Sequence, residues 1–135
     1  MNYILDTNTI IYFIKGTYPS LETRLKNTPA QSVFIPAIVK AEIEYGARKS
    51  RDYEKTIEIY RKFFEAFRIV PFDGNMSIEY GRIRSDLEKR GDIIGPNDLI
   101  IAATALSMGG RLITHNTSEF GRIEGILLED WTETS

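Results

Sequence analysis

The chain has 135 residues, of which 42% are hydrophobic and 27% charged, and its formal net charge is −2. This length suits one domain, and the composition excludes a disordered chain and a strongly basic nucleic-acid coat protein. The chain contains no cysteine, and His115 is its single histidine. These counts exclude disulfides, thiolate zinc sites, cysteine nucleophiles and multi-histidine metal centres.

No segment is typical of a targeting signal or a membrane span. The N-terminus has no basic region, and its short apolar run ends at Asp6, which is unlike a secretory signal peptide. The longest apolar stretch, Leu99–Leu106, is far shorter than the ~20 residues that span a bilayer. We therefore expect a cytoplasmic protein with no membrane partner.

Short apolar runs alternate with helical patterns along the chain. The first half is predicted to contain a strand at 3–5, helices at 7–15 and 19–26, a strand at 33–35, and helices at 36–49 and 53–66. The second half is predicted to contain a strand at 68–72, a helix at 75–90, a buried helix at 96–108, and strands at 111–114 and 126–128. Strands that alternate with helices pair in parallel through crossover helices, so the predicted fold class is an α/β sandwich.

Several polar side chains follow the predicted strands, where ligands gather in open α/β sheets. Asp6 directly follows the first strand, and Asn116 and Glu119 follow the strand at 111–114. Asp98 lies in the first turn of the buried helix. Each of these residues alone has a simpler explanation as a helix cap, a partner of the helix dipole, a turn residue or a surface residue.

Glu42 is harder to explain as a purely structural residue. The helical spacing places it on one face with Ile38, Ala41 and Tyr45, between apolar neighbours. A carboxylate on an apolar face costs free energy unless it has a partner. Asp73, by contrast, directly precedes Gly74, and a turn or cap explains it.

The acids are more informative together than apart. Carboxylates at one edge of a sheet repel each other unless some are protonated or a cation neutralises them. Oxygen ligands without a cluster of histidines or cysteines favour a hard cation, Mg²⁺ or Mn²⁺. Sites of this kind hydrolyse phosphate esters, and two ions ~4 Å apart can activate a water and steady the leaving oxygen.

Four motifs resemble those of the PIN-domain ribonucleases and, more narrowly, of the VapC toxins of type II toxin–antitoxin modules. The motifs are Asp6-Thr7-Asn8, Ala41-Glu42, the run Ile94–Ala103 (IGPNDLIIAA) and the run Thr114–Phe120 (THNTSEF). The resemblance extends over nearly the whole chain, to Trp131. It implies a PIN-like three-layer sandwich, with a central parallel sheet of four or five strands flanked by helices, as one PIN domain over residues 1–135.

The resemblance also assigns a metal pocket. Asp6 and Asp98 take the positions of principal Mg²⁺ ligands, and Glu42 that of a ligand to a second ion or to a coordinated water. Glu119 falls on a fourth acidic position, where relatives often carry Asp, and Asn116 matches a polar position near the pocket. Thr7 and Thr114 are candidates to orient carboxylates or water, and His115 receives no catalytic role.

The implied activity is Mg²⁺-dependent endonucleolytic cleavage of RNA, with Mn²⁺ as a substitute ion. The subgroup implies initiator tRNA as the target, cut in its anticodon loop to inhibit translation. The implied partners are a VapB-type antitoxin, which blocks the acidic pocket, and a second copy in a homodimer. If metal neutralises the four acids, the remaining charge is mildly basic. Candidates for phosphate contacts are Lys15, Arg24, Lys26, Arg48, Lys49 and Arg51.

Other functions stay open at this point. A PIN nuclease could act in RNA maturation, and a catalytically silent module could only bind RNA or protein. A phosphotransfer enzyme with Asp6 as nucleophile fits less well, because a haloacid-dehalogenase-like signature needs a second Asp at the place of Asn8. The aromatic residues Tyr60, Phe63, Phe64 and Phe67 are expected mostly in the core, with some available to a dimer or antitoxin groove.

Overall fold

The computed structural model describes residues 1–133. Its strands are β1 (Tyr3–Leu5), β2 (Val33–Pro36), β3 (Arg68–Val70), β4 (Arg111–Ile113) and β5 (Leu127–Glu129). Its helices are α1 (Thr7–Lys15), α2 (Pro19–Lys26), α3 (Ala37–Arg48), α4 (Tyr53–Glu65), α5 (Gly74–Arg90), α6 (Pro96–Met108) and α7 (Thr117–Phe120). A short 3₁₀ turn covers Ala30–Ser32.

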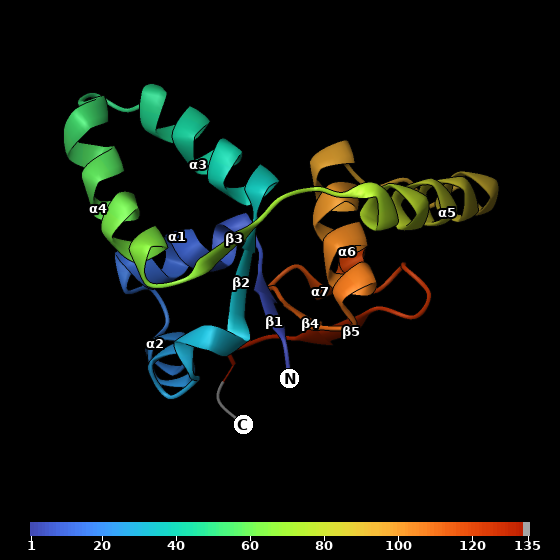
Figure 1. Ribbon diagram of the computed structural model, residues 1–135, viewed down its shortest axis with the longest axis horizontal. Coiled ribbons are helices and arrows are strands. Elements are labelled where there is room, and N and C mark those ends of the chain that lie inside the picture. Colours follow the sequence, from blue (N-terminus) through green and yellow to red (C-terminus); the bar gives the residue numbers. More distant parts are fainter. Residues whose placement is uncertain (134–135) are drawn as a thin grey trace.

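The five strands form one parallel sheet in the order β3-β2-β1-β4-β5. The chain runs outward from β1 to β2 and β3, then returns to the other side of β1 for β4 and β5 (Figure 1). All the strands therefore end at the same edge of the sheet, and the order reverses between β1 and β4. Such a reversal point is where parallel α/β sheets bind ligands. The α/β fold predicted from the sequence is confirmed.

The helices form two groups that flank the sheet. In Figure 1, α3 and α4 stand together on one side of the molecule, and on the other side α5 packs against α6 and runs across it. α6 is the buried helix that its all-apolar middle predicts, because Leu99, Ile101, Ala102, Ala103 and Ala105 are all almost fully shielded from water. The amino ends of α1 and α6 thus come to the edge where β1 and β4 end.

Local signals in the sequence set several element boundaries. Asp73 caps α5, since its side chain accepts a hydrogen bond from the backbone N–H of Met76 at 2.9 Å, which confirms its structural role. A Cβ at Gly110 would meet the side chain of Ile4 and lie 2.8 Å from the carbonyl oxygen of Asn2, so only glycine fits there. β3 ends at Val70, two residues earlier than predicted, because Pro71 has no N–H to continue the ladder.

α3 buries a different face from the one predicted. Its buried residues are Val39, Ile43 and Ala47, whereas Tyr45 is 66% exposed. The helix carries two apolar stripes, and its packing against α1 and α4 selects the stripe without Tyr45. Glu42 is half-buried at the border between the two stripes.

The aromatic cluster of α4 belongs mainly to the core. Phe63 and Phe64 are 8% and 7% exposed, and the Phe63 ring packs against Phe13 and Phe67 with centroids 5.4 and 4.9 Å apart. The side chains of Phe63 and Phe64 are thus largely enclosed, although Phe64 also lines an open hollow together with Lys40, Arg61, Glu65 and Ile69. In residues 1–133, no helix combines the length and the apolar character that crossing a membrane requires.

Candidate active site

Asp6 is a buried carboxylate held by hydrogen bonds from two directions. It is 5% exposed and lies where β1 passes into α1. Its Oδ1 accepts a hydrogen bond from the backbone N–H of Thr9 at 2.9 Å, and its Oδ2 accepts one from the hydroxyl of Thr114 at 2.6 Å. The cap predicted from the sequence is therefore present, and β4 supplies a second contact to the same carboxylate.

Burial raises the pKa of Asp6 above its usual value. The hydrogen bonds from Thr114 and Thr9 act in the opposite direction, while the negative charge of Glu42 raises the pKa further. A cation close to such a buried carboxylate would favour its ionised form.

Glu42 is brought to the same edge by α3. Its Oε1 accepts a hydrogen bond from the hydroxyl of Thr7 at 2.5 Å, and its Oε2 accepts one from the side-chain amide of Asn97 at 3.3 Å. Thr7 begins α1 and Asn97 lies in the first turn of α6. These contacts give Glu42 the polar partners that its place beside an apolar stripe requires.

Glu119 and Asn116 form a pair after β4. The side-chain amide of Asn116 donates to Glu119 Oε2 at 2.5 Å, and the backbone N–H of Asn116 donates to the Thr114 hydroxyl at 3.0 Å. Thr114 in turn donates to Asp6. A chain of hydrogen bonds therefore connects Glu119 to the carboxylate at the end of β1.

Asp98 shows most directly that the four acids belong to one cluster. Burial raises its pKa to about 6, and the charges of Glu42, Glu119 and Asp6 add to the effect. Glu42, Glu119 and Asp6 come from three other segments of the chain, and the charge of each disfavours the ionised form of Asp98. We refer to Asp6, Glu42, Asp98 and Glu119 as the acid cluster.

Two positioning residues are absent from the sequence-based set. Thr9 is buried and holds both β1 and β4, because its N–H donates to Asp6 and its hydroxyl donates to the carbonyl of Ile113 at 3.0 Å. Asn97 contacts Glu42 and directly precedes Asp98 in the motif run, a signal that could have identified it. Within residues 1–133, the side chain of His115 makes no hydrogen bond to any of the four acids: its Nδ1 lies 2.9 Å from Asp130 Oδ2 and 3.0 Å from Thr132 Oγ1.

The donor set fits a hard divalent cation. The acid cluster offers only oxygen ligands, and burial together with the charges of the other three acids raises the pKa of Asp98. Within residues 1–133, no three His, Asp or Glu side chains lie close enough together to coordinate one metal ion.

Two open hollows flank Glu42. One, of about 420 Å³, is lined by Thr7, Ile38, Ala41, Glu42, Tyr45 and Asn97. The other, of about 180 Å³, lies among α1, α3 and α4 and includes Lys15, Glu42 and Tyr60. Glu42 thus lines both hollows. Each hollow also contains a tyrosine, Tyr45 in the larger one and Tyr60 in the smaller one.

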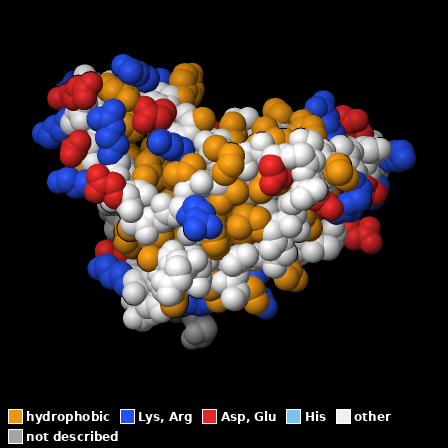
Figure 2. All heavy atoms as spheres, in the orientation of Figure 1, with side chains coloured by type: hydrophobic (Ala, Val, Ile, Leu, Met, Phe, Trp, Pro, Cys, Tyr) orange, Lys and Arg blue, Asp and Glu red, His pale blue; other side chains and the backbone are white. Residues whose placement is uncertain are grey.

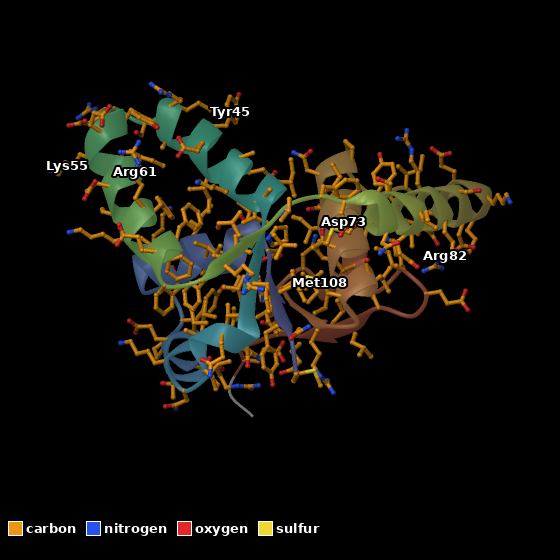
Figure 3. The ribbon with its side chains drawn as sticks, in the orientation of Figure 1. Tyr45, Lys55, Arg61, Asp73, Arg82 and Met108 are labelled. Carbon is orange, nitrogen blue, oxygen red and sulfur yellow. The ribbon has the colours of Figure 1, made fainter. Side chains whose placement is uncertain are left out.

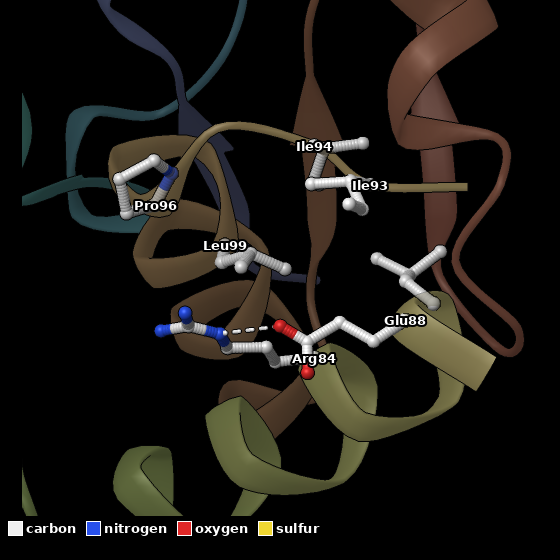
Figure 4. A pocket seen from close by; sticks show the side chains of 7 residues that line it. Arg84, Glu88, Ile93, Ile94, Pro96 and Leu99 are labelled. Atoms are coloured by element: carbon white, nitrogen blue, oxygen red, sulfur yellow. Dashed lines mark hydrogen bonds and ion pairs between the residues drawn. The ribbon is translucent and has the colours of Figure 1, made fainter. Parts of the chain in front are cut away.

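A third hollow lies away from the acid cluster. It occupies about 130 Å³ between α5 and the start of α6, and Leu87, Ile93, Ile94, Pro96 and Leu99 make it apolar (Figure 4). The ion pair of Arg84 and Glu88, 3.2 Å long, closes one side. None of the residues that line this hollow belongs to the acid cluster, so we do not include it in the candidate active site.

The basic residues proposed for phosphate contacts differ in their surroundings. Lys15 lines the smaller hollow beside Glu42. Arg24 is paired with Glu129 at 2.9 Å, and Lys26 lies 3.8 Å from Glu22. Lys49 lies 5.1 Å from the centre of the Tyr45 ring. Arg48 lies 3.7 Å from the centre of the Tyr53 ring. Lys15 thus lines one hollow at Glu42, and Lys49 contacts Tyr45, which lines the other.

Replacement of the two threonines separates positioning from folding. Thr7→Val frees Glu42 at a half-buried position, so we expect any hydrolytic activity of the acid cluster to fall about 10- to 100-fold with little change in thermal stability. Thr114→Val removes a buried donor to Asp6, so we expect a similar loss of activity and a destabilisation of about 1–3 kcal/mol. Urea unfolding and hydrolysis rates measure both. Full activity in both variants would show that neither hydroxyl positions a working carboxylate.

Comparison with known proteins identifies relatives along almost the full length. A profile of the PIN domain matches residues 3–126. The chain is 38% identical over 135 residues to Ribonuclease VapC2 of Rickettsia felis, with 97% of this chain and 98% of the relative covered. It is 35% identical over 131 residues to the tRNA(fMet)-specific endonuclease VapC of Salmonella typhimurium, again with 97% and 98% covered.

Solved structures show the same fold. The chain matches DNA-bound VapBC from Salmonella typhimurium with a TM-score of 0.92 at 34% identity, covering 97% of this chain and 98% of that one. It matches VapBC2 from Rickettsia felis, bound to a promoter DNA fragment, with a TM-score of 0.88 at 36% identity, covering 97% and 99%. From its sequence, its sheet order and these matches, the chain belongs to the PIN-domain family and, within it, to the VapC ribonucleases.

Proposed function

We propose that this chain is a divalent-metal-dependent endoribonuclease that acts as the toxin of a type II toxin–antitoxin module. The observation that carries the proposal is the gathering of four carboxylates at the edge where β1 and β4 end. Hydrogen bonds through Asn116 and Thr114 connect Glu119 to Asp6, and the charges of Glu42, Glu119 and Asp6 help to raise the pKa of Asp98. Relatives of 35–38% identity carry the names ribonuclease and endonuclease, which supports an RNA-cleaving hydrolase.

In this proposal Asp6 and Asp98 are the principal ligands of Mg²⁺, for which Mn²⁺ can substitute, and Glu42 and Glu119 complete the site. A bound divalent ion supplies Lewis-acid activation of water and charge neutralisation for phosphodiester hydrolysis. Thr9 and Thr114 fix the Asp6 carboxylate, while Thr7 and Asn97 fix Glu42. Asn116 orients Glu119, directly or through water.

The proposed substrate is initiator tRNA, cut in its anticodon loop so that translation stops. The name of the Salmonella relative, a tRNA(fMet)-specific endonuclease, supports this target. A toxin acting on tRNA would work in the cytoplasm. The remaining alternative within the family, a PIN nuclease of RNA maturation, would use the same acid cluster on another RNA.

The proposed partners are a VapB-type antitoxin and a second copy of the chain. Both solved relatives described above are VapBC complexes, which supports an antitoxin partner. We expect the antitoxin to cover the acid cluster and to abolish cleavage when it is added in equimolar amount. The homodimer is tested by the mass of the purified chain in sedimentation.

Incubation of total tRNA with the purified chain tests the function. We expect one discrete fragment pair in Mg²⁺, none in EDTA and none with Asp98→Ala, and sequencing of the new ends identifies the target and the cut. Cleavage of other RNA but not of tRNA would support a ribonuclease and would contradict tRNA as its substrate. Absence of any Mg²⁺-dependent, Asp98-dependent cleavage would contradict the proposal and favour a catalytically silent binding module.

A further inference from the structure

Tyr45 is an exposed aromatic residue with no place in the core. Its side chain is 66% exposed on α3, on the apolar stripe that does not pack against α1 and α4. In Figure 3 it projects from α3 on the side away from α4. A single exposed aromatic residue is ordinary, but Tyr45 shares an open hollow with Ile38 and Ala41, and a ring with one polar edge suits contact with another molecule.

The ring borders the larger of the two hollows at Glu42. Ile38, Ala41 and Tyr45 form its apolar wall, and Thr7, Glu42 and Asn97 form its polar wall. Its volume of about 420 Å³ lies within the ~300–1,000 Å³ range of small-molecule sites. A flat apolar group with polar edges, the size of one nucleobase, matches this arrangement.

Glu42 connects this hollow to the acid cluster. Glu42 lines the hollow, and its carboxylate accepts hydrogen bonds from Thr7 and Asn97. These two residues are the chain neighbours of Asp6 and Asp98, so the hollow adjoins both carboxylates. A phosphodiester held at the acid cluster therefore has an adjoining nucleotide within reach of the Tyr45 ring. Figure 2 shows hydrophobic side chains exposed at the surface on this face of the molecule, between the two helical groups.

We propose that Tyr45 is a stacking surface for an unpaired RNA base next to the phosphate that is cut. Aromatic side chains stack on the splayed bases of single-stranded loops, which is how proteins bind unpaired RNA. Lys49 lies over one face of the ring, with its Nζ 5.1 Å from the ring centre, so the base would stack on the other face and the ammonium group would be near its phosphate. Asn97 and Thr7 lie at the opposite wall, where they can hydrogen-bond to the edge of the base.

RNA fits this surface better than a protein partner does. The hollow adjoins the acid cluster through Glu42, one of its two walls is polar, and Lys49 places a positive charge over the Tyr45 ring. The inference rests on the proposed function, because it assumes that RNA is cut at the acid cluster. It goes further by restricting the substrate to RNA whose base beside the cut is unpaired, and by assigning Tyr45 to substrate selection.

Kinetics on the anticodon stem-loop of initiator tRNA test the proposal. We expect Tyr45→Ala to lower kcat/KM about 5- to 150-fold, the range found for loss of one stacked base. Tyr45→Phe keeps the ring and should stay within about twofold of the parent. Ile78→Ala is the matched control, because Ile78 is 71% exposed on α5 and lines neither hollow at Glu42.

An abasic nucleotide identifies the partner of the ring. Placed at the stacked position, it should slow the parent enzyme as much as Tyr45→Ala does and should not slow Tyr45→Ala further, since the two changes remove one contact. Additive effects at every position flanking the cut would overturn the proposal. So would an unchanged kcat/KM for Tyr45→Ala.

Two further readouts separate the other outcomes. If Tyr45→Ala changes the sedimentation mass, or weakens antitoxin binding while cleavage is unchanged, the ring belongs to a protein interface and the proposal is wrong. If the parent chain cuts no RNA, the proposed nuclease fails, and fluorescence anisotropy of the labelled stem-loop in EDTA tests stacking alone. Weaker binding by Tyr45→Ala than by Ile78→Ala would support stacking, and equal binding would overturn it.

Discussion

Asp98→Asn is expected to abolish RNA cleavage and, without metal, to make the protein more stable. Loss of an outer partner of a metal ligand costs about 10- to 100-fold, so loss of a ligand carboxylate should cost more. Asp98 has a pKa raised to about 6 by burial and by the charges of Glu42, Glu119 and Asp6. Asparagine has nearly the same shape and no charge, so it relieves this repulsion.

The stability gain has a defined pH dependence. Below about pH 4, Asp98 is largely protonated in both the folded and the unfolded protein and does not destabilise the fold. As the pH rises to and through about 6, the carboxyl must ionise in the folded protein, and the free energy of unfolding falls. Asp98→Asn should therefore match the parent near pH 4 and exceed it above pH 6, by at most about 3 kcal/mol. Thermal unfolding in EDTA from pH 4 to 8 measures the difference.

A lower stability of Asp98→Asn at pH 7.5 would contradict this account, because it would mean that the carboxylate supports the fold through the helix dipole. Addition of Mg²⁺ provides a second comparison. The ion should raise the melting temperature of the parent and leave that of Asp98→Asn unchanged, since a ligand stabilises only the state that binds it.

Substitutions at Asp6 are expected to separate its two roles. Both Asp6→Asn and Asp6→Ala should lose cleavage, because both remove the proposed metal ligand. Only Asp6→Ala should be strongly destabilised, by about 1–3 kcal/mol relative to Asp6→Asn, since it leaves the N–H of Thr9 and the hydroxyl of Thr114 without their acceptor. Chemical denaturation in EDTA, together with cleavage assays, measures both effects.

The comparison of the two Asp6 variants is itself the control. A sharp loss of stability in Asp6→Asn would favour capping as the main role of the charged group. Retained cleavage in Asp6→Asn would remove Asp6 from the set of metal ligands and would require another residue to take its place.

Much of this arrangement follows from the sequence because its signals are local. Proline, glycine and cap residues set the helix boundaries, and the all-apolar middle of α6 predicts its burial. Asp6 and Asp98 were identifiable because one directly follows a strand and the other begins a buried helix. The alternation of strands and helices likewise predicts a parallel sheet.

The rest depends on packing between distant segments. α3 has two apolar stripes, and only its contacts with α1 and α4 decide that Val39 and Ile43 are buried while Tyr45 is exposed. The contact of Asn97 with Glu42 spans 55 positions and has no local signal beyond the adjoining Asp98. The order of the strands, which joins β4 to β1, also cannot be obtained from periodicity.

Calorimetric titration with Mg²⁺ tests the central claim most directly, because it asks whether the acid cluster holds a divalent ion. The comparison uses the parent chain, Asp98→Asn and Asp73→Asn, the last being the same chemical change at a carboxylate that caps α5. We expect binding by the parent and by Asp73→Asn, and none by Asp98→Asn. Equal binding by the parent and both variants, or no binding by the parent, would contradict a metal site at Asp6, Glu42, Asp98 and Glu119.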